Sequence, residues 1–112
     1  MTDFPRSKVV KNVLSATGEY ALPVDYTKLA VHERRLVREQ YIKLQKGLCR
    51  HCHAPLAADP PAHIKSLRIN WSLFPPNFLK YPVHLHHHHD TGMTIGAVHA
   101  LCNAVSWCYD GV

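Results

Sequence analysis

Two pairs of candidate metal ligands stand far apart in this sequence. Cys49 and Cys52 form the first pair, His99 and Cys102 form the second, and each pair has two residues between its members. Two such pairs can close one tetrahedral zinc site, because zinc accepts Cys sulfur and His nitrogen in mixed sets. We therefore predict a structural Zn²⁺ on these four side chains, which would hold the chain between them in place.

Three further residues could compete for those places. His51 and His53 lie beside the first pair, and Cys108 is left over; we expect Cys108 to be a partly buried core thiol on a helix. No signal peptide is recognisable, and no run approaches the roughly 20 apolar residues that span a bilayer. We therefore expect a cytoplasmic protein, where C-x-x-C is typical of metal binding or redox chemistry. The βαβ pattern expected around a redox site is not evident.

A run of four histidines, residues 86–89, lies between the two pairs and is followed by the turn residues Asp90-Thr91-Gly92. A neutral imidazole, with an ordinary pKa near ~6.5, can accept a proton at neutral pH or bind a metal. Phosphodiester hydrolysis needs an activated water, neutralised phosphate charge and help for the leaving oxygen. A second metal site without catalysis is an alternative reading of the run. Asp90 is explained equally well by turn geometry and by ligation.

The elements that must position these residues can be read from the pattern. Residues 83–87 alternate and predict a strand, 90–92 predict its turn, and 93–98 predict a returning strand with a bulge or close approach at Gly96. Residues 100–109 predict a short helix. In a strand, His87 and His89 would share one face, and His86 and His88 the other.

Upstream, residues 28–46 contain no Gly or Pro and carry an apolar stripe, so they predict a helix that Asp25 or Thr27 caps and Gly47 ends. Residues 1–27 show no sustained period and are expected to be loosely structured. Residues 54–82 contain many prolines, yet they are too apolar for a disordered linker. They predict a packed loop with short helical turns that covers the core.

The positive charge is uneven. Residues 1–50 hold ten of the thirteen Lys and Arg residues and five of the eight acidic ones, so that half carries the whole formal charge of +5. Such a surface suits a polyanion, most plausibly nucleic acid, although a solvated basic face is the plainer explanation. The candidate DNA-binding residues on the predicted helix are Arg34, Arg35, Arg38 and Lys43.

The order strand, turn, strand, helix, with these residues, resembles the HNH endonuclease superfamily, also called the His-Me or ββα-metal finger. The resemblance is to its zinc-stapled branch of phage recombination endonucleases, where Asp-His-x-His precedes Thr-Gly and a later C-x-x-C-Asn opens a helix. Here these elements read 86–92 and 99–103, and 45–52 resembles the entry into the zinc knuckle. The likeness covers 45–53 and 83–107. His86 and His99 replace the usual Asp and Cys, and both remain suitable ligands.

The resemblance implies a small α+β, ββα-metal domain over residues 28–112 and a phage-encoded, metal-dependent DNA endonuclease acting in the host cytoplasm. It makes His87 the general base and His89 the supporting histidine, either an additional ligand or a phosphate contact. It puts His86 and Asn103 on a catalytic divalent cation, Mg²⁺ or another. His84 and His88 are the expected bystanders. The alternatives are a non-catalytic, zinc-stabilised nucleic-acid-binding module, which does not need His86, His87 and Asn103 together, and a structural phage protein.

Overall fold

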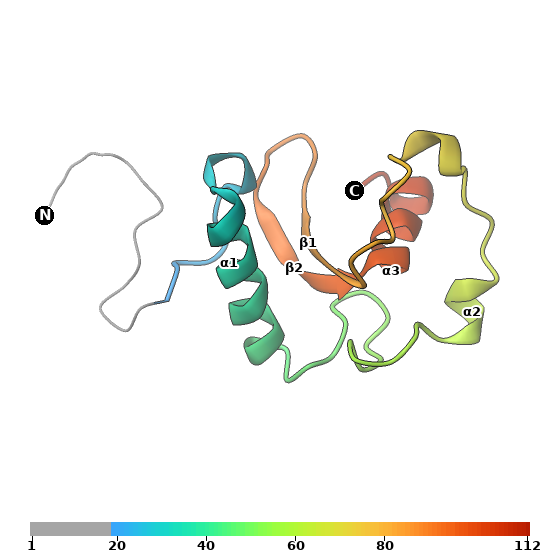
Figure 1. The fold of residues 1–112 in the computed structure, drawn as a ribbon, viewed down its shortest axis with the longest axis horizontal. Coiled ribbons are helices and arrows are strands. Elements are labelled where there is room, and N and C mark those ends of the chain that lie inside the picture. The colour runs from blue at the N-terminus through green and yellow to red at the C-terminus, as the bar shows by residue number, and fades with distance from the viewer. Residues whose placement is uncertain (1–18) are drawn as a thin grey trace, which may run out of the picture.

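The computed structural model describes residues 19–112, which form a small α+β fold (Figure 1). A two-stranded antiparallel hairpin lies at its centre, with one helix on each side. None of the helices in this described part is long and apolar enough to cross a membrane. The helices and strands are α1 (Val31–Leu44), α2 (Ala62–Lys65), β1 (Val83–His87), β2 (Thr94–His99) and α3 (Ala100–Val105).

The hairpin follows the alternation in the sequence closely. β1 has the predicted bounds, and β2 begins and ends one residue later than the predicted strand. His86 pairs with Gly96 and His87 pairs with Thr94, so Ile95 is an extra residue and forms a bulge beside the glycine. A Cβ on Gly96 would lie 2.7 Å from the side-chain oxygen of Gln45. The close approach expected at Gly96 is therefore confirmed.

The basic helix is shorter than its predicted range, 28–46. Asp25 caps a separate 3-10 turn, Tyr26–Lys28, and does not cap the helix itself. α1 begins after Ala30, whose backbone N–H donates to the carboxylate of Glu33 at 2.9 Å. The helix starts late because Asp25 caps only the 3-10 turn. The chain is then extended at Leu29 and Ala30, and α1 begins at Val31.

Part of the segment 1–27 is more ordered than its sequence predicts. Residues 1–18 lie outside the described residues. Beyond them, Tyr20 and Val24 are buried. The backbone N–H of Val24 donates to the hydroxyl of Thr94, and the N–H of Thr94 donates to the Val24 carbonyl at 2.9 Å. This stretch therefore runs along the outer edge of β2. Hydrogen bonds to β2 hold it in place, although its sequence has no periodic pattern that predicts order.

The core has two parts, one on each side of the hairpin. α1 packs on one face of β1 and β2, and α3 contacts both strands from the other side. The first part, under α1, consists of Tyr20, Val24, Leu29, Val37 and Leu85. The second part, around the Cys49–Cys52 turn, consists of Cys49, Leu56, Ile64, Ala97, Val98, Cys102 and Val105.

The loop and the C-terminal helix both follow their predicted outlines. Residues 54–82 form the short helix α2 and a 3-10 turn, Trp71–Leu73, and Ile64 of α2 is buried in the second part of the core. The predicted helix 100–109 is α3, continued by a π-helical turn, Ser106–Asp110.

Candidate metal centre and histidine pocket

The four predicted zinc ligands meet at one end of the hairpin. Cys49 and Cys52 lie in the turn after α1, His99 ends β2, and Cys102 lies in the first turn of α3. Their ligand atoms all lie within 4.8 Å of one another, and the thiols of Cys49 and Cys102 are buried. Across residues 19–112 this is the one group of three or more Cys, His, Asp or Glu side chains that could hold a metal ion. The cluster can hold a structural ion such as zinc.

The spacing inside the cluster fits tetrahedral coordination. The Nδ1 atom of His99 lies 3.5 Å from the sulfur of Cys52 and 3.7 Å from that of Cys102. Zinc bonds of about 2.3 Å to sulfur and about 2.05 Å to nitrogen, at tetrahedral angles, separate the two ligands by about 3.6 Å. The sulfur of Cys49 also accepts backbone N–H groups of His51, Cys52 and His99 at 3.4–3.5 Å. Such donors stabilise a thiolate ligand.

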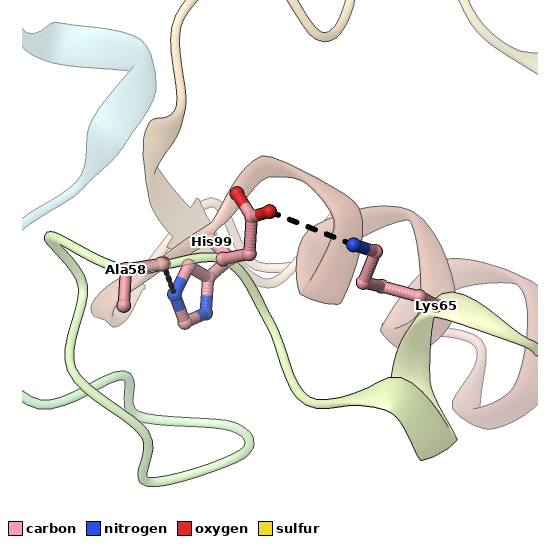
Figure 2. A network of polar contacts seen from close by, with 4 residues as sticks. Ala58, Lys65 and His99 are labelled. Carbon is pink, nitrogen blue, oxygen red and sulfur yellow. Dashed lines mark hydrogen bonds and ion pairs between the residues drawn. The ribbon is translucent and has the colours of Figure 1, made fainter.

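A contact outside the cluster sets the tautomer of His99. Its Nε2 lies 2.9 Å from the carbonyl of Ala58 and 3.0 Å from that of Pro55. Carbonyls only accept, so Nε2 must carry the proton, and the lone pair of Nδ1 faces the sulfurs. Figure 2 shows this bond beside the ion pair of Lys65 with Asp59, which are 3.5 Å apart. The exposed ion pair adds little stability by itself. The loop is therefore joined to the metal centre through His99, in addition to the hydrogen bond from the backbone N–H of Cys49 to the carbonyl of Ala54.

The three thiols are electrostatically coupled. A hydrogen bond from Cys102, supported by backbone N–H groups, lowers the pKa of Cys49 to about 3. The hydrogen bond to Cys49 and burial raise the pKa of Cys102, and burial raises the pKa of Cys52. Cys49 is therefore the thiol that loses its proton most easily. A bound divalent cation would deprotonate the other two thiols and convert all three to ligands.

The competing ligands lie elsewhere. His53 is exposed, with a left-handed φ of 66°. The Nδ1 atom of His51 lies 3.1 Å from the hydroxyl of Ser106. Cys108 is partly buried in the π-helical turn, outside the cluster, as expected from the sequence.

A pocket of about 940 Å³ lies beside β1, and no residue of β2 lines it. One wall carries His84, His87, His89 and Asn103, and the facing wall of α1 carries His32, Arg34, Arg35 and Arg38. No Asp or Glu lines the pocket in the part of the chain that the structure describes. A cavity bordered by guanidinium and imidazole groups without carboxylates favours an anion. The apolar and aromatic part of the lining comes from Tyr26, Val31, Phe78, Tyr81, Val83 and Leu85.

His87 is held in this pocket by an aromatic stack. Its ring lies 3.9 Å from that of Tyr26, at an interplanar angle of 8°. The guanidinium carbon of Arg34 lies 4.1 Å from the centroid of the Tyr26 ring. Two planar groups at these distances cannot share one face of a ring, so Tyr26 lies between them. The Nδ1 atom of His87 is buried and meets no hydrogen-bond partner among the described residues. Burial lowers the pKa of His87, so its ring is neutral at neutral pH.

His89 lies beside His87, although β1 ends at His87 and His89 belongs to the following turn. The two ring centroids are 5.3 Å apart, and the ring of His89 is 4.3 Å from that of Trp107. His88 is exposed in the turn and does not line the pocket.

The structure does not bring His86 and Asn103 together. The amide Nδ2 of Asn103 donates to Nδ1 of His84 at 3.1 Å. His86 is buried outside the pocket, and its Nε2 lies 3.2 Å from the carbonyl of Val112. His84 and His86 are two residues apart on β1, which separates them by roughly 6.6 Å along the strand. Asn103 lies beside His84 and not beside His86. Its partner in the structure is therefore His84, whereas the resemblance pairs it with His86.

The predicted DNA-binding set divides in two. Arg34, Arg35 and Arg38 all line the pocket from α1. Arg35 also pairs with exposed Glu39 at 3.5 Å. Lys43 lies on a separate small pocket of about 240 Å³, whose lining includes Glu39.

Tyr26, Tyr81 and His84 are pocket residues that the sequence pattern does not mark as functional. Tyr26 falls in a segment without periodicity, and Tyr81 falls in the proline-rich loop. For His84, the one available signal is its place in the alternating segment 83–87, which predicts a strand but does not predict a functional role. No protein-family model, no curated protein and no solved structure matches this chain.

Proposed function

We propose that this protein is a metal-dependent DNA endonuclease of the HNH type, phage-encoded, with His87 as the general base. The observation that supports the proposal most is the pocket that holds the neutral ring of His87 opposite three arginines of α1. A base and an anion-binding wall facing one another are what phosphodiester hydrolysis requires.

In this proposal, His87 accepts a proton from a water molecule as its oxygen attacks phosphorus. The bond from phosphorus to the 3′ oxygen breaks, and that oxygen takes a proton from solvent. The guanidinium groups of Arg35 and Arg38 offset the negative charge that builds on the phosphate, and Arg34, on the far side of the Tyr26 ring, adds positive charge at longer range. The stack on Tyr26 fixes the orientation of the base, and burial keeps it unprotonated.

The resemblance assigns a divalent cation, Mg²⁺ or another, to His86 and Asn103. These two side chains have different hydrogen-bond partners, Val112 for His86 and His84 for Asn103. The proposal keeps the dependence on a divalent cation and names His84, beside Asn103 on the pocket wall, as the competing candidate ligand.

The second candidate function is a zinc-stabilised nucleic-acid-binding module without catalysis. It is favoured by the fact that the histidine run in residues 19–112 supplies no cluster of three metal ligands, whereas the basic pocket is present. Both functions predict DNA binding that weakens with salt. Only the nuclease predicts strand cleavage.

The test is incubation of the purified protein with supercoiled plasmid in Mg²⁺, Mn²⁺, Ni²⁺ or a chelator that spares the structural site. We expect nicked or linear plasmid with at least one of the ions and none with the chelator. Binding without cleavage under every ion would reject the nuclease and leave the binding module.

A further inference from the structure

We propose that the pocket beside β1 receives an unpaired nucleotide, whose base stacks on Tyr81 while its phosphate lies on the arginines of α1. The inference deepens the proposed function, on which it rests, by naming the substrate class: single-stranded or locally unpaired nucleic acid.

The first support is the apolar part of the pocket lining. Tyr81 is 64% exposed and Val31 is 81% exposed, and both line the pocket together with Phe78. A site that binds only a phosphate group does not require exposed apolar and aromatic side chains. Exposed aromatic rings beside a positively charged groove are the usual means by which proteins hold single strands, because every base has a face that can stack.

The second support is size. A volume of about 940 Å³ lies near the upper end of the roughly 300–1,000 Å³ found for small-molecule sites, so the pocket accommodates more than a phosphate group. A base within a duplex is stacked and paired, and it cannot enter such a pocket unless it is extruded. A strand whose bases are already free enters without that cost.

The third support is the position of charge around the tyrosine. The ammonium of Lys80 lies 5.5 Å from the ring centroid of Tyr81, and Arg34, Arg35 and Arg38 border the same pocket. Cations near the ring and along the same pocket suit a backbone that runs past a stacked base. Phe78 joins this wall to the histidines, since its ring lies 4.7 Å from that of His84.

The test measures binding in chelator, so that cleavage does not interfere. The probes are a short oligothymidylate, the same strand built with abasic residues, and a duplex of equal length. We expect the wild type to bind oligothymidylate about fivefold or more tighter than the abasic strand, and tighter than the duplex. Tyr81→Ala should lose the preference for bases and keep the salt dependence, and Tyr81→Phe should keep both.

Tyr109→Ala is the matched control, because Tyr109 is 54% exposed and does not line the pocket. Equal binding of the abasic and thymidylate strands by the wild type, or a preference that survives Tyr81→Ala, would overturn the inference and leave the proposed nuclease intact. Tyr81-dependent binding by a protein that never cleaves would reject the nuclease and retain the nucleotide site. Thermal unfolding of each variant shows that its fold is preserved.

Discussion

The ring of His87 lies flat against the ring of Tyr26, with 3.9 Å between their centroids and 8° between their planes. The general base of the proposed reaction is thus oriented by a residue that precedes α1 and lies sixty positions before the start of the histidine run in the sequence. The stack also contributes to the burial that lowers the pKa of His87.

Removing that stack should change both the rate and its pH dependence. A general base works unprotonated, so the rate falls as the pH drops through its pKa, and a lowered pKa keeps the enzyme active below the ordinary value near ~6.5. Tyr26→Ala exposes His87 to water, so its pKa should rise and the acid limb should move to higher pH. We expect cleavage at neutral pH to fall roughly tenfold through lost positioning.

The control for this change is Tyr26→Phe, which keeps the stacked ring and should keep the wild-type pH profile. The measurement is the rate of plasmid nicking as a function of pH for the three proteins. If Tyr26→Ala lowers the rate without moving the acid limb, Tyr26 does not act through the protonation of His87.

The metal centre should be necessary for the fold. We expect one zinc per chain, and His99→Ala should lose it together with the packing around the Cys49–Cys52 turn, because binding to such sites is worth about 10–16 kcal/mol in small zinc domains. Elemental analysis and circular dichroism, before and after strong chelation, measure both effects. Cys108→Ser is the matched control and should leave zinc content unchanged. A folded, zinc-free protein would refute this prediction.

Much of this centre could be predicted from the sequence, because ligand types and spacing are local information. The two pairs of residues predict one site, and the structure brings all four ligand atoms together. The alternation likewise predicts β1 with its observed bounds. The strand ends at His87, so the nearness of His89 to His87 comes from the turn and not from the alternation.

The hydrogen bond between Asn103 and His84 could not be predicted from local sequence pattern. It depends on how far α3 is shifted along β1, and that shift is set by tertiary packing and not by periodicity. The placement of Tyr26 and Val24 could not be predicted for the same reason, since hydrogen bonds to the distant residues Gly92 and Thr94 hold that segment in place. Local pattern thus identifies the ligands and the strand, and long-range packing decides their partners.

The ligand pair of the catalytic ion can be assigned by metal rescue. If the ion binds at the observed contact, His84→Ala and Asn103→Ala should both weaken cleavage, and excess divalent cation should partly restore it. His86→Ala should then show no metal dependence of its own, because His86 faces Val112. Titration of nicking rate against Mn²⁺ for each variant distinguishes the two pairs. Rescue of His86→Ala, with His84→Ala unaffected, would restore the pair that the resemblance implies.

The arginines of α1 should carry the salt-dependent part of DNA binding. Replacing Arg34, Arg35 and Arg38 together by Glu should weaken binding and reduce the slope of log affinity against log salt by roughly 1 for each phosphate that is no longer neutralised. Lys43→Glu, which changes charge on α1 away from the pocket, should have a smaller effect. Fluorescence anisotropy across a salt series measures both quantities. An unchanged slope in a folded triple variant would show that these arginines form only a solvated surface.

The most direct test of the central claim compares His87→Ala with His88→Ala in plasmid cleavage. Both substitutions remove one imidazole from the same run, but only His87 lines the pocket. We expect His87→Ala to lose cleavage by about 100-fold or more while it keeps zinc, fold and DNA affinity, and His88→Ala to stay close to wild type. A His87→Ala protein that nicks plasmid at the wild-type rate, or a wild type that never does, would contradict the account.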